Sequence, residues 1–344
     1  MERSTKVREE RIPVAVLGAT GAVGQRFVSL LEDHPWFELR EVLASPRSAG
    51  KSYGDAMDWL VPAKLPADAA QLKVRALGST VESRLCFSAL DASVAKEAEE
   101  DLARLGKIVC SNAGSWRMDP TVPLIVPEIN PEHLELLNKQ TAWSGSILCN
   151  PNCSTIGLTL ALKPILDRFG IKRVSVVTMQ AISGAGTPSI KTLDMLANVI
   201  PHIAGEEEKL EREAFKILGS AFDLSAQCNR VPVIDGHTLC VNVELEEAAT
   251  REELLATWRG FKALPQELKL PTAPAPLIHL AEDEFGPQPM LHREAGNGMA
   301  IHIGRVRERS RKEWLFTTLS HNTVRGAAGG AILLAELALE TGRI

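Results

Sequence analysis

The sequence has few of the features that mark secreted, membrane-embedded or nucleic-acid-binding proteins. Its 344 residues include only 6 cysteines, which form no CxxC pair and no metal-ligand spacing, so a disulfide scaffold and a metal site are disfavoured. The formal net charge of -5 creates no basic field that would attract nucleic acid. The longest apolar run near the C-terminus, Ala331 to Leu339, contains Glu336 and is too short for a membrane span, and the charged first residues lack a signal-peptide core. We therefore expect a cytoplasmic protein that binds no membrane, nucleic acid or metal.

What the chain does contain is an ordinary globular composition, with 45% hydrophobic and 24% charged residues. A chain of this length is expected to form two domains, or one domain with a large insertion. The pattern of the sequence changes character after Cys153, which favours two domains.

The N-terminal half alternates between strand-like and helix-like segments. An apolar and β-branched run, Ile12 to Leu17, leads into a glycine-rich turn and then into a helical pattern. Further strands are predicted at Glu38 to Ala44, Leu85 to Ser88 and Ile108 to Ser111. A helix is predicted around Val94 to Leu105. Such alternation predicts an α/β fold with a parallel sheet and helical crossovers.

The turn after the first strand has the spacing GxxGxxG, formed by Gly18, Gly21 and Gly24. Between a strand and a helix, such a turn lets the backbone approach the pyrophosphate of a dinucleotide at the helix N-terminus. A tight turn without a ligand is the alternative. The residues predicted to form this cradle are Gly18, Thr20, Gly21, Ala22, Val23 and Gly24.

The stretch after the second predicted strand indicates which dinucleotide is bound. Enzymes that use NAD usually place an acidic residue there to bind the ribose 2′-hydroxyl. Here the stretch contains hydroxyls and cations, which suit a 2′-phosphate and therefore NADP(H). The residues are Ser45, Arg47, Ser48 and Lys51. A solvated basic loop is the alternative.

The second half is typical of a separate α+β domain. An apolar helical pattern begins at Cys153, and a strand is predicted from Val174 to Met179. Pro164 falls inside this helix, and because an internal proline costs about 3 kcal/mol, a kink or break is expected near Leu162. The chain closes with a nearly all-apolar helix from Thr323 to Thr341, which must pack against another part of the protein.

Cys153 follows a rigid Asn-Pro-Asn turn at the start of the predicted helix. A cysteine at a helix start faces the positive end of the helix dipole and unpaired backbone N–H groups, which lower the pKa of its thiol below the usual value of about 8.5. The position therefore suits a thiolate nucleophile. A lone cysteine is more often a buried structural residue, so the choice depends on its context.

Three further segments supply polar groups for such a nucleophile. Arg230 and His237 lie in an apolar strand pattern, and histidine has a pKa suited to proton transfer near neutral pH. Gln180 ends a predicted strand and could orient the thiol or a substrate group. Glu206 and Lys209 lie in a charged run that would otherwise be a solvated helix face. Each of these residues, taken alone, also fits a structural or surface position.

Together these residues resemble aspartate-semialdehyde dehydrogenase, of the branch typical of archaea and fungi. The resemblance spans residues 12 to 342 and rests on the order and spacing of its motifs. In chain order these are Gly18 to Gly24, Ser111-Asn112-Ala113 with Arg117, Asn150 to Thr155, Gln180, Glu206 with Lys209, Arg230 with His237, and His321 to Gly329.

The resemblance implies a Rossmann-type dinucleotide-binding domain and an α+β catalytic domain like that of glyceraldehyde-3-phosphate dehydrogenase. Residues 1-152 would form the first domain, completed by the C-terminal helix 322-344, and residues 153-321 the catalytic and dimerisation domain. The implied reaction is NADPH-dependent reductive dephosphorylation of L-4-aspartyl phosphate to L-aspartate 4-semialdehyde through a cysteine thioester, in lysine, methionine and threonine biosynthesis.

The same resemblance implies roles for the polar residues. Cys153 would attack the acyl phosphate, His237 would act as general acid and base, and Gln180 would orient the thiol or acyl group. Arg230 would grip the substrate α-carboxylate and Glu206 its α-ammonium group. The implied phosphate ligands are Lys209, Arg117 and Asn112, and further implied cofactor contacts are Ser183, Gly184 and Asn322.

Two alternatives stay open at the level of the sequence. The segment Gly114-Ser115-Trp116 and the closing helix also suit a related branch that reduces malonyl-CoA, although that substrate lacks the ammonium group that Glu206 would bind. The other alternative is a non-catalytic NADP(H)-binding redox sensor with Cys153 as its switch, although a sensor needs no charged substrate clamps. In the main interpretation the partners are a small-molecule substrate and inorganic phosphate, and the protein is a homodimer or homotetramer.

Overall fold

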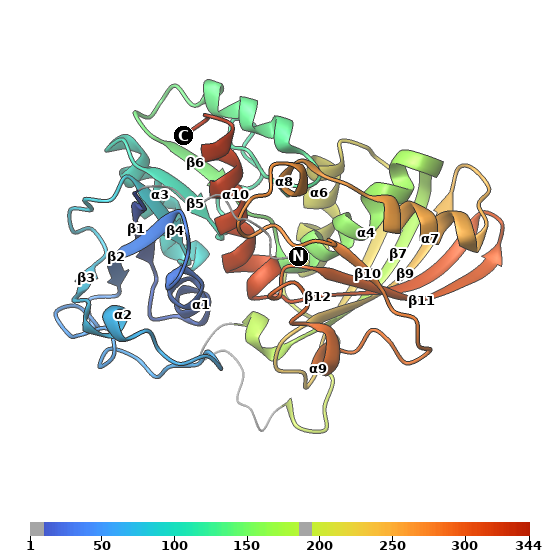
Figure 1. Ribbon diagram of the computed structural model, residues 1–344, viewed down its shortest axis with the longest axis horizontal. Coiled ribbons are helices and arrows are strands. Elements are labelled where there is room, and N and C mark those ends of the chain that lie inside the picture. The colour runs from blue at the N-terminus through green and yellow to red at the C-terminus, as the bar shows by residue number, and fades with distance from the viewer. Residues whose placement is uncertain (1–9, 186–194) are drawn as a thin grey trace.

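The computed structural model describes residues 10–185 and 195–344, which fold around two six-stranded sheets (Figure 1). The first sheet is built from the N-terminal half, and the second from residues after Cys153. The predicted α/β fold, with a Rossmann-type domain followed by an α+β domain, is confirmed.

The first sheet is entirely parallel, with strand order β3-β2-β1-β4-β5-β6. The order reverses between β1 and β4, so the carboxyl ends of these strands flank a crevice in which a dinucleotide can bind. Its strands are β1 (Ile12–Leu17), β2 (Phe37–Ala44), β3 (Val74–Ala76), β4 (Leu85–Ser88), β5 (Ile108–Ser111) and β6 (Ser146–Cys149). The helices of this half are α1 (Ala22–Leu31), α2 (Ala67–Gln71), α3 (Ala92–Arg104) and the 3₁₀ helix η1 (Pro131–Lys139).

The second sheet is mixed, with strand order β10-β11-β12-β9-β7-β8. The four inner strands are antiparallel to one another, and the two outer strands run parallel to their neighbours. Its strands are β7 (Ile171–Gln180), β8 (Asp223–Arg230), β9 (His237–Leu245), β10 (Ile278–Leu280), β11 (Ile301–Ser310) and β12 (Glu313–Ser320). The helices of this half are α4 (Cys153–Phe169), η2 (Ile182–Ala185), α6 (Glu206–Leu218), α7 (Arg251–Gly260), α8 (Leu264–Glu267) and α9 (Pro289–His292).

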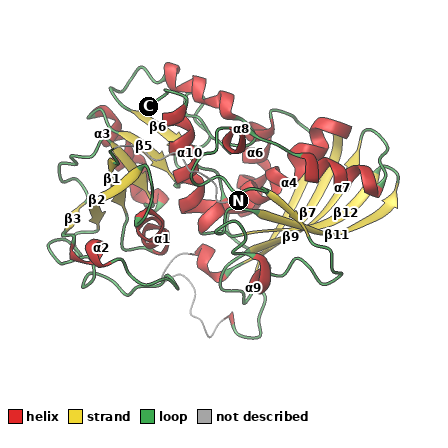
Figure 2. Ribbon diagram, viewed as in Figure 1, coloured by secondary structure: helices red, strands yellow, loops and turns green. Residues whose placement is uncertain are grey.

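Only one face of the second sheet is covered by helices. Buried and exposed residues alternate along β7 and β9, as expected when one face packs on a core and the other does not. Helices α4, α6 and α7 lie over the covered face (Figure 2), where Leu160, Val174 and Val241 belong to one apolar core. The opposite face carries Val177, which is 40% exposed.

The apolar C-terminal segment packs against the first sheet. Helix α10 (Gly329–Glu340) shares an apolar core with β1 and α1, in which Val16, Phe27 and Leu333 are buried. A π-helical turn, η3 (Val324–Ala328), precedes α10, where one continuous helix was predicted from Thr323. In the part of the chain that the structure describes, no helix has both the length and the apolar character needed to cross a bilayer.

A kink or break was predicted near Leu162, but helix α4 continues through Pro164, so a break is wrong. Both residues are buried, and α4 packs against α6, α7, β9 and η3. The burial of this inner helix outweighs the cost of about 3 kcal/mol that an internal proline imposes.

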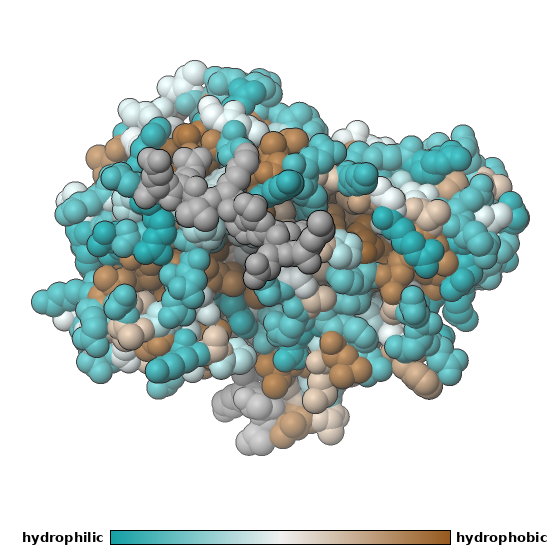
Figure 3. Space-filling model, in the orientation of Figure 1, coloured by the Kyte–Doolittle hydropathy of each residue, from teal (hydrophilic) through white to brown (hydrophobic). Residues whose placement is uncertain are grey.

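The surface seen in Figure 3 is largely hydrophilic, with apolar residues exposed around α9. Met290 and Leu291 in this short helix are 85% and 67% exposed. Isolated exposed apolar residues are common on soluble proteins, so these two alone indicate no particular partner.

Candidate active site

Cys153 is the first residue of α4, at the point where the two halves of the chain meet. Asn152 caps this helix, because its Oδ1 accepts hydrogen bonds from the backbone N–H groups of Ser154 (2.9 Å) and Thr155 (3.3 Å). The η3 turn approaches so closely that a Cβ added to Gly326 would lie 2.6 Å from the Cβ of Cys153. Only glycine fits at that position, so the backbone of η3 packs directly against Cys153.

His237, the first residue of β9, contacts the thiol. Its Nε2 lies 3.2 Å from Sγ of Cys153, and its Nδ1 accepts a hydrogen bond from the backbone N–H of Ala181 (3.0 Å). A ring nitrogen that accepts a hydrogen bond carries no proton. The neutral imidazole therefore holds its proton on Nε2 and donates it toward the sulfur.

The pKa of Cys153 is shifted in the direction opposite to that predicted from the sequence. Burial raises the pKa of this thiol to about 12, and the Glu206 carboxylate adds to the rise. Arg117 and Arg230 act in the opposite direction but do not overcome burial. Burial also lowers the pKa of His237 to about 3. The expected thiolate is therefore wrong for the ligand-free protein, in which a neutral thiol faces a neutral imidazole.

Glu206 and Gln180 lie beside this pair. Glu206, the first residue of α6, is buried, and its Oε2 accepts a hydrogen bond from Nδ2 of Asn152 (2.8 Å). Its Oε1 pairs with Lys209 (3.0 Å), whose side chain is half-exposed. Gln180 is buried at the end of β7, with its Nε2 3.5 Å from Oε2 of Glu206. Glu206 is thus part of the site and not a solvated helix residue.

Arg230 ends β8 next to Gln180 in the sheet register and is buried. Its Nη1 donates a hydrogen bond to the Ala181 carbonyl (2.8 Å), while its Nε has no hydrogen-bond partner among the described residues. A Cβ added to Gly184 would lie 3.0 Å from Nη1 of Arg230 and 3.2 Å from Nε2 of His237. The guanidinium and the imidazole therefore both lie against Gly184.

Arg117 and Asn112 bring buried N–H groups to the site. Arg117 pairs with Glu213 through Nη1 (2.9 Å) and donates to the Asn112 carbonyl through Nη2 (2.6 Å). The Asn112 side-chain oxygen accepts a hydrogen bond from Nδ2 of Asn150 (2.8 Å). Within residues 10–185 and 195–344, the buried Nδ2 of Asn112 and Nε of Arg117 find no acceptor. Unsatisfied buried donors of this kind are suited to an anion.

One cleft connects Asn112, Arg117 and Cys153 to the glycine-rich turn. The other predicted residues of the catalytic end do not line it, namely Gln180, Glu206, Lys209, Arg230 and His237. Gly18 has a φ of +72°, and a Cβ there would lie 2.6 Å from a backbone oxygen. A Cβ on Gly24 would lie 2.2 Å from the Gly18 oxygen, so Gly24 supports the turn from behind. The predicted residues that line the cleft are Gly18, Thr20, Gly21, Ala22, Val23, Ser45, Arg47, Asn112, Arg117, Cys153, Ser183, Gly184 and Asn322. Ser48 does not line it, and no described group of His, Cys, Asp or Glu could hold a metal ion.

Comparison with known proteins gives full-length matches. A model of the semialdehyde dehydrogenase NAD-binding domain matches residues 13–137, and a model of the semialdehyde dehydrogenase dimerisation domain matches residues 162–325. Aspartate-semialdehyde dehydrogenase of Archaeoglobus fulgidus is 45% identical over 343 residues, which cover 96% of this chain and 98% of the relative. The chain belongs to the aspartate-semialdehyde dehydrogenase family.

Relatives of this aspartate-semialdehyde dehydrogenase family member confirm the predicted branch. The Schizosaccharomyces pombe enzyme is 43% identical over 350 residues, covering 96% of this chain and 98% of the relative. The structure of aspartate semialdehyde dehydrogenase with NADP from Candida albicans is similar in fold, with a TM-score of 0.88 and 38% identity. This match covers 97% of this chain and 100% of the other.

Two polar residues of this family member's site were missed from the sequence. Asn152 joins the start of α4 to Glu206, and Glu213 holds both Arg117 and the backbone of Asn152. An Asn directly before a helix is a common N-cap, which was an available signal. Glu213 lies seven residues after Glu206 and therefore on the same face of α6, which also pointed toward the site.

The neutral Cys153–His237 pair predicts how the thiol reacts without ligands. The thiolate is the reactive form, and below the thiol pKa its population rises about tenfold per pH unit. Alkylation of Cys153 by iodoacetamide, followed by peptide mass spectrometry, should therefore accelerate steadily from about pH 7 to about pH 9. A rate that is already constant below about pH 8 would show a thiolate in the resting protein.

Proposed function

We propose that the protein catalyses NADPH-dependent reductive dephosphorylation of L-4-aspartyl phosphate to L-aspartate 4-semialdehyde, a step toward lysine, methionine and threonine. The observation that carries this proposal is the 3.2 Å contact between Sγ of Cys153 and Nε2 of His237 beside a cleft that also contains the glycine-rich turn. The names of the archaeal and fungal relatives support it.

In the first step, the sulfur of Cys153 forms a bond to the acyl carbon, and the carbon–oxygen bond to phosphate breaks. The thiol proton leaves with the phosphate, so the products are a thioester and hydrogen phosphate. NADPH, when bound, supplies the hydride that reduces the thioester. The product of hydride addition is a hemithioacetal alkoxide, whose carbon–sulfur bond breaks as the oxyanion becomes the carbonyl oxygen of the aldehyde. The sulfur leaves as a thiolate, which regains a proton from water.

His237 was predicted to act as general acid and base, and from its hydrogen bonds we propose instead that it assists this sequence as a hydrogen-bond donor at Nε2. Its Nδ1 is occupied by the Ala181 N–H, so formation of an imidazolium would cost that hydrogen bond. The Nε2 proton instead stabilises negative charge on the sulfur as it forms and as it leaves. Gln180, buried next to Glu206, orients the acyl group.

The charged residues around the pair complement a substrate with three charged groups. Arg230, with its unpartnered Nε among the described residues, suits the α-carboxylate, and Glu206 suits the α-ammonium group. The residues proposed to hold the phosphate are Asn112, Arg117 and Lys209. Malonyl-CoA lacks an ammonium group, and a redox sensor needs no such charges, so neither alternative accounts for a buried Glu206 at this place.

The residues of the cleft fit NADP(H). The turn at Gly18 leaves no room for a side chain, as close approach of a pyrophosphate requires, and Ser45 with Arg47 suits a 2′-phosphate. The proposed pyrophosphate cradle consists of Gly18, Thr20, Gly21, Ala22 and Val23, supported by Gly24. Near the catalytic end, Asn322 joins Ser183 to the backbone of Gly236 at 2.9 and 2.8 Å. We propose that Ser183, Gly184 and Asn322 contact the nicotinamide half.

The division into domains follows the two sheets. We propose that residues 1-152 with the C-terminal segment 322-344 form the nucleotide-binding domain, because α10 is buried against β1. Residues 153-321 form the catalytic and dimerisation domain. All six cysteines are free, which is consistent with the reducing cytoplasm that we propose as its location.

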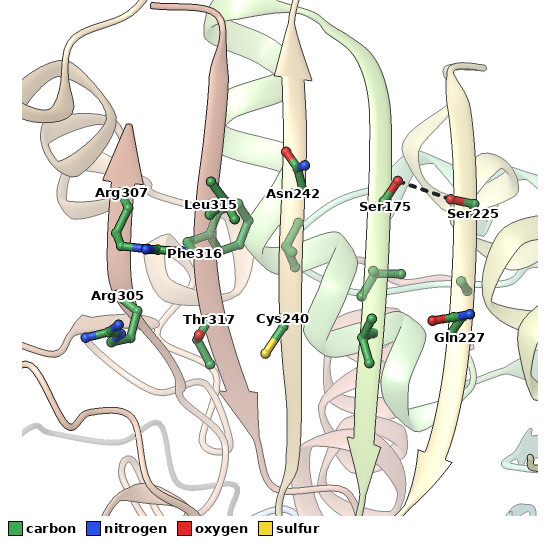
Figure 4. Close-up of a pocket in the computed structure, with 14 residues that line it drawn as sticks. Ser175, Ser225, Gln227, Cys240, Asn242, Arg305, Arg307, Leu315, Phe316 and Thr317 are labelled. Carbon is green, nitrogen blue, oxygen red and sulfur yellow. Dashed lines mark hydrogen bonds between the residues drawn. The ribbon is translucent and has the colours of Figure 1, made fainter. Parts of the chain in front are cut away.

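The open face of the second sheet is the proposed interface of a homodimer, which can pair further into a homotetramer. Figure 4 shows this face, with side chains of five strands on the side away from the helices. Val177 and Leu315 are among the apolar residues there, and Arg305 and Arg307 lie at one edge. A one-sided sheet in a domain that matches a dimerisation model is suited to packing against its own copy.

Replacement of Cys153 by serine should abolish turnover, because a serine hydroxyl is too weakly acidic to replace the thiol as nucleophile. The assay is phosphate-dependent oxidation of aspartate semialdehyde, followed by NADPH absorbance. NADPH binding, measured by fluorescence titration, should stay within about twofold of the wild-type value. Cys240→Ser, at an exposed cysteine, is the matched control and should remain active. Turnover by Cys153→Ser would refute the assignment of the nucleophile.

Arg47→Ala should reduce the preference for NADP over NAD. A charge-assisted contact to a phosphate contributes roughly 1.5 to 3 kcal/mol, so the ratio of the two kcat/KM values should fall about tenfold or more. Lys51→Ala removes a nearby exposed cation that does not line the cleft and should leave the ratio unchanged. Equal kcat/KM values for both cofactors in the wild type would contradict the NADP assignment.

Val177→Glu should weaken the proposed dimer, since a carboxylate would be buried without a partner in the interface. Sedimentation velocity of wild type and variant over a concentration series measures the change. Leu105→Glu introduces the same charge at a 71% exposed position at the end of α3 and should not alter assembly. Identical sedimentation of Val177→Glu and wild type would place the interface elsewhere.

A further inference from the structure

Helix α6 presents a row of charged side chains to the loops that form the cleft. Glu206, Lys209, Glu213 and Lys216 follow one another at intervals of three and four residues and therefore lie on one face of the helix. At the far end of this row, Lys216 donates hydrogen bonds to the carbonyls of Arg117 (2.7 Å), Asp119 (2.8 Å) and Val122 (3.0 Å).

Glu213 has the central position in this row. Its side chain is only 3% exposed, and its two oxygens contact two different parts of the site. Oε1 accepts a hydrogen bond from Nη1 of Arg117 (2.9 Å), and Oε2 accepts one from the backbone N–H of Asn152 (2.7 Å). One buried carboxylate thus joins the arginine of the anion site to the residue directly before Cys153.

We propose that Glu213 is a positioning residue that sets the guanidinium of Arg117 at a fixed place relative to Cys153. The inference rests on the proposed function, in which Arg117 holds the phosphate group. Arg117 is held on one side by Glu213 and on another by the Asn112 carbonyl, while its Nε has no acceptor among the described residues. These two contacts determine which edge of the guanidinium faces the cleft.

Glu213 could act through its charge or through the position of Arg117, and the two roles predict opposite changes in phosphate affinity when Glu213 is replaced. Glu213 is an anion beside an anion site, so if only its charge mattered, its removal would strengthen the binding of phosphate. If Glu213 acts through the position of Arg117, its removal weakens phosphate binding, because the guanidinium loses its preorganised direction. The sign of the change therefore separates the two roles.

Glu213→Gln keeps the size of the side chain but cannot keep both contacts. The amide has one oxygen to accept a hydrogen bond, and its NH₂ group would face either the Arg117 guanidinium or the Asn152 N–H, which are both donors. Glu208→Gln makes the same chemical change at an exposed position of the same helix and is the matched control.

The experiment is calorimetric titration of the full-length protein with inorganic phosphate. Glu213→Gln should weaken phosphate binding about tenfold or more, while Glu208→Gln should stay within about twofold of wild type. The KM for aspartate semialdehyde, whose α-carboxylate and ammonium groups are assigned to Arg230 and Glu206, should change much less than the KM for phosphate.

A double-mutant cycle tests whether Glu213 acts through Arg117. In an Arg117→Ala background, Glu213→Gln should cause no further loss of phosphate affinity, because the two residues act as one unit. An equal further loss in that background, unchanged phosphate affinity of the single variant, or tighter binding would each overturn the proposal.

A second variant of Glu213 tests the proposal if the first variant is not folded. If Glu213→Gln does not fold, Glu213→Asp retains the charge but shortens the reach, and it should still weaken phosphate binding about threefold or more. Wild-type phosphate affinity in Glu213→Asp would then overturn the proposal. Phosphate titration does not require turnover, so wild-type protein that binds phosphate but does not oxidise aspartate semialdehyde would contradict the proposed function alone.

Discussion

The site depends on the hydrogen bonds around Asn152, which hold the start of α4 on three sides. The side-chain oxygen of this residue caps the helix, its side-chain nitrogen donates to Glu206, and its backbone N–H donates to Glu213. The two carboxylates belong to α6, so the residue before Cys153 is bound to a helix far away in the sequence. Because the sulfur is attached to the next residue, these contacts determine where the nucleophile lies relative to His237.

The ligand-free site combines buried charges with a neutral reactive pair. Arg117 is paired with Glu213, and burial alone would lower the pKa of this guanidinium, but the Glu213 carboxylate raises it, so the charge is retained. For Cys153, Arg117 and Arg230 do not offset the effect of burial on the pKa, and for His237 Arg230 adds to it, so both neutral forms are favoured. In surroundings of low polarity, a charged substrate group close to Cys153 and His237 strongly changes the pKa values of the thiol and the imidazole. We therefore expect the reactivity of the Cys153 thiol to differ between the ligand-free protein and the protein with substrate bound.

The sequence predicted those features that depend on neighbouring residues. The alternation of strands and helices, the glycine-rich turn and the first residue of α4 are local patterns, and the structure confirms them. A kink or break near Leu162 was predicted from local propensity, and a break is wrong because packing on several sides stabilises the helix. A lowered pKa was predicted for Cys153 from its position at the start of a helix. Burial, which only the fold determines, raises that pKa instead. Glu213 was missed although it shares a face of α6 with Glu206, because that spacing does not identify the buried partners that Glu213 contacts.

The contact of Gly326 with Cys153 also has a consequence for folding. The glycine that packs against Cys153 and the apolar layer of α10 both come from a segment far along the chain from the parts of the protein that they contact. Until that segment packs, the first sheet lacks part of its core and Cys153 lacks one of its contacts. Contacts between segments so distant in the chain form late, because loop closure must precede them. The cleft is therefore completed late in folding, when this segment packs against the first sheet and against Cys153.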